Sequence, residues 1–447
     1  MVENMKNNIL KDFAKYVSLN VISMIGMSFY ILADTFFIAN GVGSIGLTGL
    51  NLVLPLWSLV SGIGLMIGMG AGIRYSIQRG KNNERGANKV FTHAVVMGLS
   101  IGLVITIIGL FFSYDIVRIL GADEIVAPLA GEYLKTLLSF SCIFILNNII
   151  TAFVRNDNEP NLAMIAMILG SLSNIVLDYV FIYPFKLGMF GAALATGTTP
   201  ILSLIILSIH FIRKKNNFKL IKCKFNSSYV KSIISLGVPS FITEFSSGII
   251  ILLFNFTILR ISNNTGVAAY GIIANLALIV VSIFTGVAQG IQPIISKSHG
   301  EGKSENTKTI FKYGLITAIV LGVGCYFVGF KFSEEIVNLF NSEGDKLLLS
   351  MAVEGVKIYF IAFIIMGLNI VTTSFFASIN KAKESFIISI SRGLVVVVPL
   401  ILLLPNLFGM TGVWLTIPLA EVITLLISFV FYVKYRKRRG KEWCSQL

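Results

Sequence analysis

Long apolar stretches separated by short polar segments run through the whole of this 447-residue chain. Each stretch has about 20 residues or more, which is enough for a helix to cross a hydrocarbon core of about 30 Å. The alternation of apolar and polar residues that is typical of membrane β-strands does not occur, so the pattern predicts an all-α membrane protein. The twelve predicted transmembrane helices cover residues 14–38, 48–72, 91–113, 134–154, 162–183, 190–212, 232–259, 268–295, 310–330, 355–378, 386–405 and 411–433.

A polar, basic segment near the middle of the chain divides these helices into two sets of six. The predicted divisions are a cytoplasmic N-terminus (1–12), an N-lobe (13–212), a cytoplasmic inter-lobe loop (213–231), a C-lobe (232–433) and a basic cytoplasmic tail (434–447). Because an even number of helices gives both halves the same orientation, an axis along the membrane normal should relate them. We therefore expect two pseudo-symmetric six-helix lobes with a central cavity between them.

Residues recur between the two halves at a nearly constant offset. Gly64, Gly68, Ser76, Gly80 and Lys81 return as Gly286, Gly290, Ser298, Gly302 and Lys303. Pro184, Gly188, Met189, Gly191 and Leu194 return as Pro405, Gly409, Met410, Gly412 and Leu415. Matches over two separate regions indicate an internal duplication. The recurring glycines favour close helix packing over ligand binding, since glycine lets helix backbones approach each other in lipid.

Charge is sparse and unevenly distributed. Charged residues make up 13% of the chain, about half of the fraction in soluble domains. The net charge of +14 is concentrated in the N-terminus, the even-numbered loops and the tail, and only Arg118, Lys186, Arg260, Lys331 and Lys346 fall on the opposite side. By the positive-inside rule, this predicts a multi-pass protein of the cytoplasmic membrane with both termini in the cytoplasm. The charge then needs no nucleic-acid partner, and the tail segment 434–441 can contact membrane lipids.

Four carboxylic acids lie inside predicted spans, where an isolated charge costs several kcal/mol. They are Asp34, Asp178, Glu244 and Glu421, and the corresponding positions of the other half hold Phe256, Pro399, Ile22 and Pro200. The scaffold is duplicated, but the acids are not. This asymmetry favours a functional role, because two similar folds would share their structural requirements.

Asp34, Asp178 and Thr196 are predicted to lie at one depth, in the outer third of the N-lobe, from their distances to the helix ends at 1.5 Å per residue. Asn174 precedes Asp178 by four residues and lies on the same helix face. Two carboxylates, an amide and a hydroxyl form a set of hard oxygen ligands that suits Na⁺ or a shared proton, and a close carboxylate pair titrates as a unit. The alternative is a structural polar cap near a helix end.

Glu244 and Glu421 are predicted to lie nearer the membrane midplane in the C-lobe, where they would attract a cationic substrate. The alternative for each is a hydrogen bond to a neighbouring helix. Arg392 is expected either to extend its head group to the membrane surface or to pair with a carboxylate. Aromatic residues could line a cavity for planar cations. The predicted substrate-cavity residues are Tyr30, Phe153, Glu244, Asn275, Gln289 and Glu421.

Enzyme signatures such as HExxH and the Walker A loop are absent from the sequence. We therefore expect a secondary transporter driven by an ion gradient, with H⁺ or Na⁺ as coupling ion and no cofactor. A membrane-embedded prenyl transferase would need clustered aspartates for Mg²⁺ and diphosphate, whereas the acids here are isolated. A passive channel is a further alternative, which uphill transport would exclude.

Motifs in both halves together resemble the multidrug and toxic compound extrusion (MATE) family, and within it the branch of MepA-type bacterial efflux pumps. They are DTFFI from Asp34, FVRNDNEPNLAM from Phe153, GVP from Gly237 and QGIQPI from Gln289. The resemblance implies two six-helix lobes around a V-shaped cavity, and a monomer that exports cationic amphipathic small molecules by antiport with H⁺ or Na⁺. A flippase for lipid-linked precursors, from the same superfamily, is the alternative that the resemblance leaves open.

The resemblance also implies site residues. The residues that match the family's N-lobe site for H⁺ or Na⁺ are Asp34, Asn174, Asp178 and Thr196, and Tyr133 matches a tyrosine near that site. Glu244 resembles a C-lobe glutamate of the Na⁺-coupled members, but the aspartate that those members carry in the tenth span is absent from residues 359–378. The first span also lacks a proline that many relatives have, so a proline cannot bend it.

Overall fold

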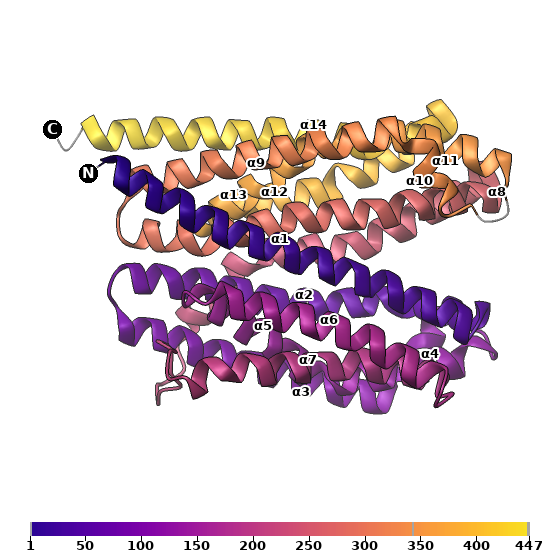
Figure 1. Ribbon diagram of the computed structural model, residues 1–447, viewed down its shortest axis with the longest axis horizontal. Helices are drawn as coiled ribbons and strands as arrows, with labels where there is room; N and C mark the ends of the chain where they lie inside the picture. Colours follow the sequence, from indigo (N-terminus) through magenta and orange to yellow (C-terminus); the bar gives the residue numbers. More distant parts are fainter. Residues whose placement is uncertain (1, 342–343, 445–447) are drawn as a thin grey trace.

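Helices account for most of the chain in the computed structural model, which describes residues 2–341 and 344–444 (Figure 1). The first half contains α1 (Val2–Gly41), α2 (Ser44–Gly80), α3 (Glu84–Ile119), α4 (Val126–Ser139), α5 (Ser141–Asn156), α6 (Pro160–Ile182) and α7 (Gly188–Ile212). The second half contains α8 (Ser227–Gly300), α9 (Ser304–Lys331), α10 (Ser333–Asn338), α11 (Lys346–Tyr359), α12 (Ile361–Ser378), α13 (Ala382–Ile390), the π-helix η1 (Ser391–Val395) and α14 (Val397–Cys444). These ranges contain no strand, so the predicted all-α class is confirmed. Met1 of the predicted N-terminal segment and residues 445–447 of the predicted tail lie outside the described residues.

The longest helix, α8, crosses the bundle twice. It has 74 residues, and its backbone is non-helical at Ser262 and Asn263. Phe254 stacks on Tyr270 with 4.9 Å between the ring centroids, so the two arms on either side of the break run next to each other. The second arm therefore returns toward the end of the bundle from which the first arm starts.

The span that α13, η1 and α14 form also reverses direction, at Gly409, whose φ is 57°. Glycine adopts this left-handed backbone conformation without the steric cost that other residues meet. Gly188, the repeat counterpart of Gly409, has φ of 54° and begins α7. Nine described helical segments are long and apolar enough to cross a membrane, and α4 with α5, bent by 48°, form a tenth. Since two of these ten reverse, the described chain makes the twelve predicted crossings.

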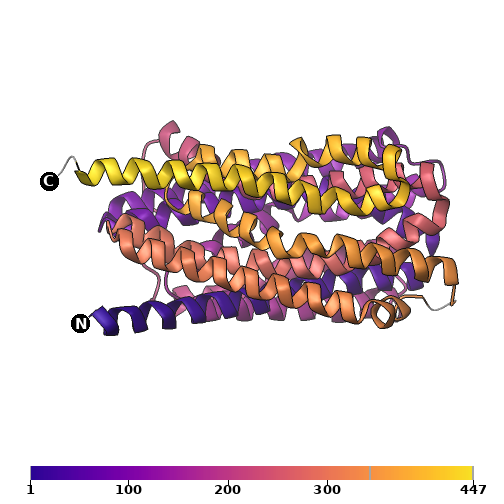
Figure 2. The same ribbon diagram turned by 90° about the horizontal axis from the view of Figure 1, so that it is seen from above.

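Figure 1 shows α2–α7 in one layer and α8–α14 in a second layer, with α1 running diagonally along both. Each layer has its own apolar core, and α1 adds Phe13 and Val17 to the core of the second layer. Both termini lie at one end of the bundle, called here the termini end, as Figure 2 shows from above. The opposite end is called the far end. This arrangement places α1 where it contacts both halves.

Close backbone contacts join the two layers toward the termini end. A Cβ atom at Gly237 on α8 would overlap the Met66 carbonyl on α2, and one at Gly80 on α2 would overlap the Lys297 carbonyl on α8. A Cβ at Gly290 would lie 2.7 Å from the Cα of Val17 on α1. Only glycine permits such approach. The prediction that the recurring glycines serve packing is therefore confirmed at Gly80 and Gly290.

Candidate ion-coupling site

The predicted aspartate pair comes together between α1 and α6. These helices lie side by side, because Gly26 faces Ile168 and Gly41 faces Ile182. Asp34 on α1 and Asp178 on α6 share a side-chain hydrogen bond, and Asp178 is fully buried. Asp34 lies seven residues before the end of α1, which is about 10 Å from the far end.

Asn174 and Thr196 complete the contact. The Asn174 amide donates to Asp178 Oδ2 at 3.1 Å and accepts from the Thr196 backbone N–H at 3.3 Å when its nitrogen faces Asp178. In the opposite orientation the amide nitrogen instead donates to Thr196 Oγ1 at 3.4 Å. Tyr133 on α4 is buried and lies near Thr196. The structure thus gathers all five residues of the predicted N-lobe site, which come from α1, α4, α6 and α7.

Two carboxylate oxygens in this cluster have no hydrogen-bond partner among the described residues: Oδ1 of Asp34 and Oδ1 of Asp178. A buried polar atom without a partner costs about 1–3 kcal/mol, so these two oxygen atoms are well placed to accept a proton or a cation. A hydrogen bond between two carboxyl groups also requires a proton on one of them. The cluster can therefore hold one proton between its acids or present several oxygen atoms to a small cation.

Glu244 lies on the first arm of α8 and faces the other layer. Its carboxyl group lies near the Ser61 side chain on α2. Tyr30, one turn before Asp34 on α1, is close enough to interact electrostatically with Asp34, Asp178 and Glu244. Tyr30 on α1 and Glu244 on α8, both predicted to line the substrate cavity, thus lie where the second layer comes near the ion-site aspartates.

Glu421 occupies a different environment, inside the second half. It is 2% exposed, and its Oε1 accepts from Arg392 Nε at 2.7 Å. The Asn369 amide donates to Glu421 Oε2 at 2.8 Å. Arg392 belongs to η1, a wider helical turn that shifts the register of the residues after it. In this conformation the Glu421 charge is therefore neutralised within the C-terminal core, as one of the alternatives for Arg392 anticipated, and its role in the substrate cavity stays a prediction.

Removing Arg392 should destabilise the protein strongly, because the Glu421 carboxylate would stay buried with only an amide partner. We expect Arg392→Met to lower the free energy of unfolding by about 3–5 kcal/mol, measured by thermal unfolding in detergent. Arg260→Met, which changes an exposed arginine on α8 in the same way, should have little effect. Adding Glu421→Gln to Arg392→Met should recover most of the loss. An unchanged midpoint of thermal unfolding for Arg392→Met would contradict the assigned role of the Arg392–Glu421 pair.

Two further predicted cavity residues, Phe153 and Gln289, are held in contacts within the protein in this conformation, and their cavity role stays a prediction. Phe153 has no exposed surface, because its ring packs against those of Tyr75, Phe91 and Phe218. Gln289 accepts from the guanidinium of Arg155. Neither side chain faces an open cavity in this conformation. Asn275 is exposed on α8, and its predicted role stays a prediction.

A buried polar network at the termini end joins the two layers, and the sequence reasoning missed it. Arg155 on α5 donates to Asn20 on α1 and to Gln289 on α8. The guanidinium is 3% exposed, and its Nε atom has no partner in the described chain. Asn156 adds a second bridge, because its side chain bonds with that of Gln292 on α8. The sequence feature that could have indicated this network is a run of polar residues at the end of an apolar helix, RND at 155–157.

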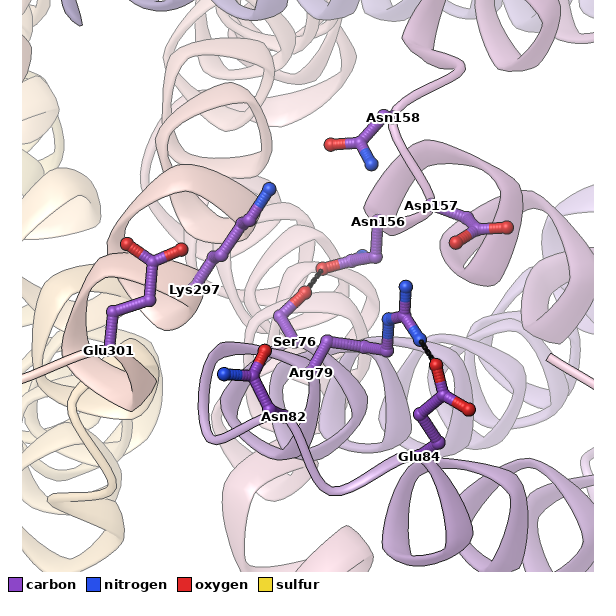
Figure 3. Close-up of a pocket in the computed structure, with 9 residues that line it drawn as sticks. All are labelled: Ser76, Arg79, Asn82, Glu84, Asn156, Asp157, Asn158, Lys297 and Glu301. Carbon is purple, nitrogen blue, oxygen red and sulfur yellow. Dashed lines mark hydrogen bonds and ion pairs between the residues drawn. The ribbon is translucent and has the colours of Figure 1, made fainter. Parts of the chain in front are cut away.

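The third residue of this motif, Asp157, holds the segment that connects the layers. Its carboxylate accepts from Tyr75 Oη at 2.6 Å and from the Asn217 backbone N–H at 2.7 Å, and it bonds with His210 Nε2 at 2.9 Å. The network borders a cavity of about 300 Å³ between the two layers (Figure 3). Figure 3 shows Lys297 of α8 and Glu301, the residue after its end, on one side of this cavity and the Ser76–Asn156 hydrogen bond on the other.

A sequence profile of the MatE family matches residues 20–180 and 239–403 of the chain. The chain belongs to the MatE family. The two matched segments lie in the two halves, as the internal duplication predicts. Membership of the MatE family places the chain among secondary transporters rather than enzymes, in agreement with the absence of enzyme motifs.

Proteins of known name and structure are similar to this chain over nearly its whole length. The multidrug export protein MepA of Staphylococcus aureus is 27% identical over 413 residues, covering 92% of this chain and 90% of MepA. MepA of Staphylococcus saprophyticus is 24% identical over 440 residues, covering 97% and 95%. An outward-facing MATE transporter of the MOP superfamily superposes with a TM-score of 0.90 at 24% identity, covering 96% of both chains. A MOP-superfamily transporter from Pyrococcus furiosus superposes with a TM-score of 0.87 at 25% identity, covering 94% of this chain and 95% of that one. The predicted MATE-type fold is therefore confirmed.

Proposed function

We propose that this multi-pass membrane protein exports cationic amphipathic small molecules from the cytoplasm in exchange for protons. The proposal depends most on one observation: the half-buried carboxyl group of Asp34 and the fully buried one of Asp178, from separate helices, share a hydrogen bond, and each keeps one inaccessible oxygen atom without a partner among the described residues. Such a pair can bind and release a proton within the membrane. The similarity to MepA multidrug export proteins supports the direction and the kind of substrate.

Direct contact between the aspartates favours a proton over Na⁺ as the coupling ion. A cation bound between two carboxylates separates them, because each oxygen atom turns toward the metal. Here the carboxyl groups hydrogen-bond with each other, and the Asn174 amide can donate to Asp178 rather than present its oxygen to the same centre. The C-lobe offers no second acid for Glu244 in α12, where residues 361–378 carry no carboxylate.

A positively charged substrate is favoured by the residues near the ion site, Tyr30 on α1 and Glu244 on α8. Glu244 supplies a carboxylate and Tyr30 an aromatic ring, a combination that attracts organic cations. Tyr30 also interacts with both aspartates. Protonation of the pair therefore weakens the negative field that a cation meets, which is a direct route by which proton uptake promotes substrate release.

The coupling requires that the two facing states differ in their affinity for the proton. In our proposal the termini end faces the cytoplasm, which the concentration of basic residues there supports. The described conformation is closed at that end by the glycine contacts and by the bridges from Arg155 and Asn156. Substrate loading from the cytoplasm would require these bridges to separate.

Transport into proteoliposomes tests the coupling ion. We expect an imposed pH gradient to drive ethidium uptake against its concentration gradient, and an imposed Na⁺ gradient at constant pH to drive none. Uptake driven by Na⁺ alone would assign Na⁺ to the site instead. If neither gradient moves ethidium and cells lacking the protein accumulate lipid-linked precursors, the protein is a flippase and the proposal fails.

A further inference from the structure

A second cavity lies at the termini end, where the start of α3, the inter-lobe segment and the start of α8 meet. It has a volume of about 400 Å³. Its lining includes four cations, a cysteine and a tyrosine: Arg85, Lys89, Lys222, Lys224, Cys223 and Tyr229. Among the described residues no carboxylate lines it, and the acid next to Arg85 in the sequence, Glu84, pairs with Arg79 instead. The cavity is therefore strongly positive and lacks a counter-charge of its own.

Hydrogen bonds to side chains of α3 fix the backbone of the inter-lobe segment. The backbone N–H of Ile221 donates to Thr92 Oγ1 at 3.1 Å, and that of Asn226 donates to His93 Nε2 at 3.1 Å. Phe218 is fully buried in the aromatic cluster of the first half. Lys222 and Lys224 lie between these anchors, so the fold fixes their positions beside Lys89. Pre-organised cations bind an anion without the cost of ordering a loop.

An exposed apolar stripe of α3 leads away from this cavity toward the membrane interior. At 100° per residue, Lys89, Val96, Leu103 and Ile107 all lie within about 40° of Arg85 around the helix axis. The three apolar members of this stripe are exposed large side chains. Lys89 and Leu103 are separated by about 21 Å along the axis, which exceeds half of the hydrocarbon thickness. One face of α3 thus carries basic side chains at the membrane surface and exposed apolar side chains further into the membrane.

We propose that this cavity binds the phosphate of an anionic phospholipid, whose acyl chain lies along the α3 stripe. A free phosphate ion would use the cations but not the stripe, whereas a phospholipid uses both. Basic pockets among transmembrane helices at the membrane surface are known to take such head groups. The site is independent of the proposed transport reaction, because it shares no residue with the aspartate cluster.

Lipid binding to the detergent-purified full chain tests the proposal, with native mass spectrometry as the readout. Phosphatidylglycerol should bind to the wild type, and Lys89→Gln with Lys222→Gln should weaken that binding about 25-fold, since each basic side chain contributes about fivefold near an anionic surface. The matched control is Lys308→Gln with Lys312→Gln, two exposed lysines near the start of α9 at the same end of the bundle. Equal binding by both double variants would overturn the proposal.

Cys223 locates the bound lipid without altering any cation. Its Sγ lies 4.0 Å from His93 Nδ1. In a chain whose other three cysteines are replaced by serine, phosphatidylglycerol should slow the reaction of Cys223 with a neutral maleimide, and phosphatidylcholine should not. Unchanged labelling would overturn the proposal, and so would equal protection by inorganic phosphate at the same concentration, because the ligand would then be a soluble anion.

Discussion

Asparagine in place of Asp34 is expected to reduce gradient-driven uptake to the level of protein-free liposomes while the protein still folds. The amide has the size of the carboxyl group and can still donate to Asp178, so the contact between α1 and α6 persists. It cannot take up or release a proton, however, and the cluster loses the pair on which coupling depends. Asp178→Asn should have the same effect on uptake, because both acids belong to one titrating unit.

Proton release provides the more direct measurement for these variants. If substrate and proton exclude each other, ethidium added to detergent-solubilised wild type in weak buffer should release protons, which a pH-indicator dye detects. Asp34→Asn should bind ethidium and release none. Asp115→Asn is the matched control, because it makes the same change at an exposed position of α3 and should behave as wild type. Full proton release or full uptake by Asp34→Asn would refute the assigned ion site.

The aspartate pair could be predicted from the sequence because the depth of a residue depends only on its position along the chain. Depth in a membrane follows from the number of residues to the end of a span, at a fixed rise per residue. Counting therefore placed Asp34, Asp178 and Thr196 at one level without knowledge of the packing. The crossings and the close approach at Gly80 and Gly290 were predictable for the same reason, since length, hydropathy and repeat offset all lie in the sequence.

The residues that each helix face contacts could not be predicted in this way. Helix periodicity fixes which residues share a face, but it does not say which neighbour that face meets. Phe153 shows the difference, because an aromatic side chain suited to a cavity packs instead into an intramolecular cluster with Phe218 from the inter-lobe segment. Glu421 shows a second cause: the π-helical turn at Ser391–Val395 changes the register of its partner, and regular periodicity cannot anticipate such a turn.

Leucine in place of Gln289 should open the termini end. The substitution leaves the Arg155 guanidinium buried with one acceptor fewer, whereas a conformation open at this end lets water solvate it. Hydrogen bonds to charged groups contribute about 1.5–3 kcal/mol, so the ratio of open to closed molecules should rise roughly 10- to 150-fold. Spin labels at positions 82 and 301 border the cavity between the layers in Figure 3. Double electron–electron resonance should report a longer distance between these labels in Gln289→Leu than in the wild type.

The second substitution Arg155→Met separates this mechanism from a simple loss of packing. Methionine fills the space of the arginine stem but carries no charge, so Arg155→Met with Gln289→Leu removes the buried cation together with its acceptor. The double variant should then return toward the closed conformation, since replacing both partners by apolar groups is often neutral or stabilising. Asn275→Leu, on an exposed position of the same helix, should leave the label distance unchanged. If Gln289→Leu alone keeps the short distance, Arg155 does not hold the layers together, and the glycine contacts suffice for closure.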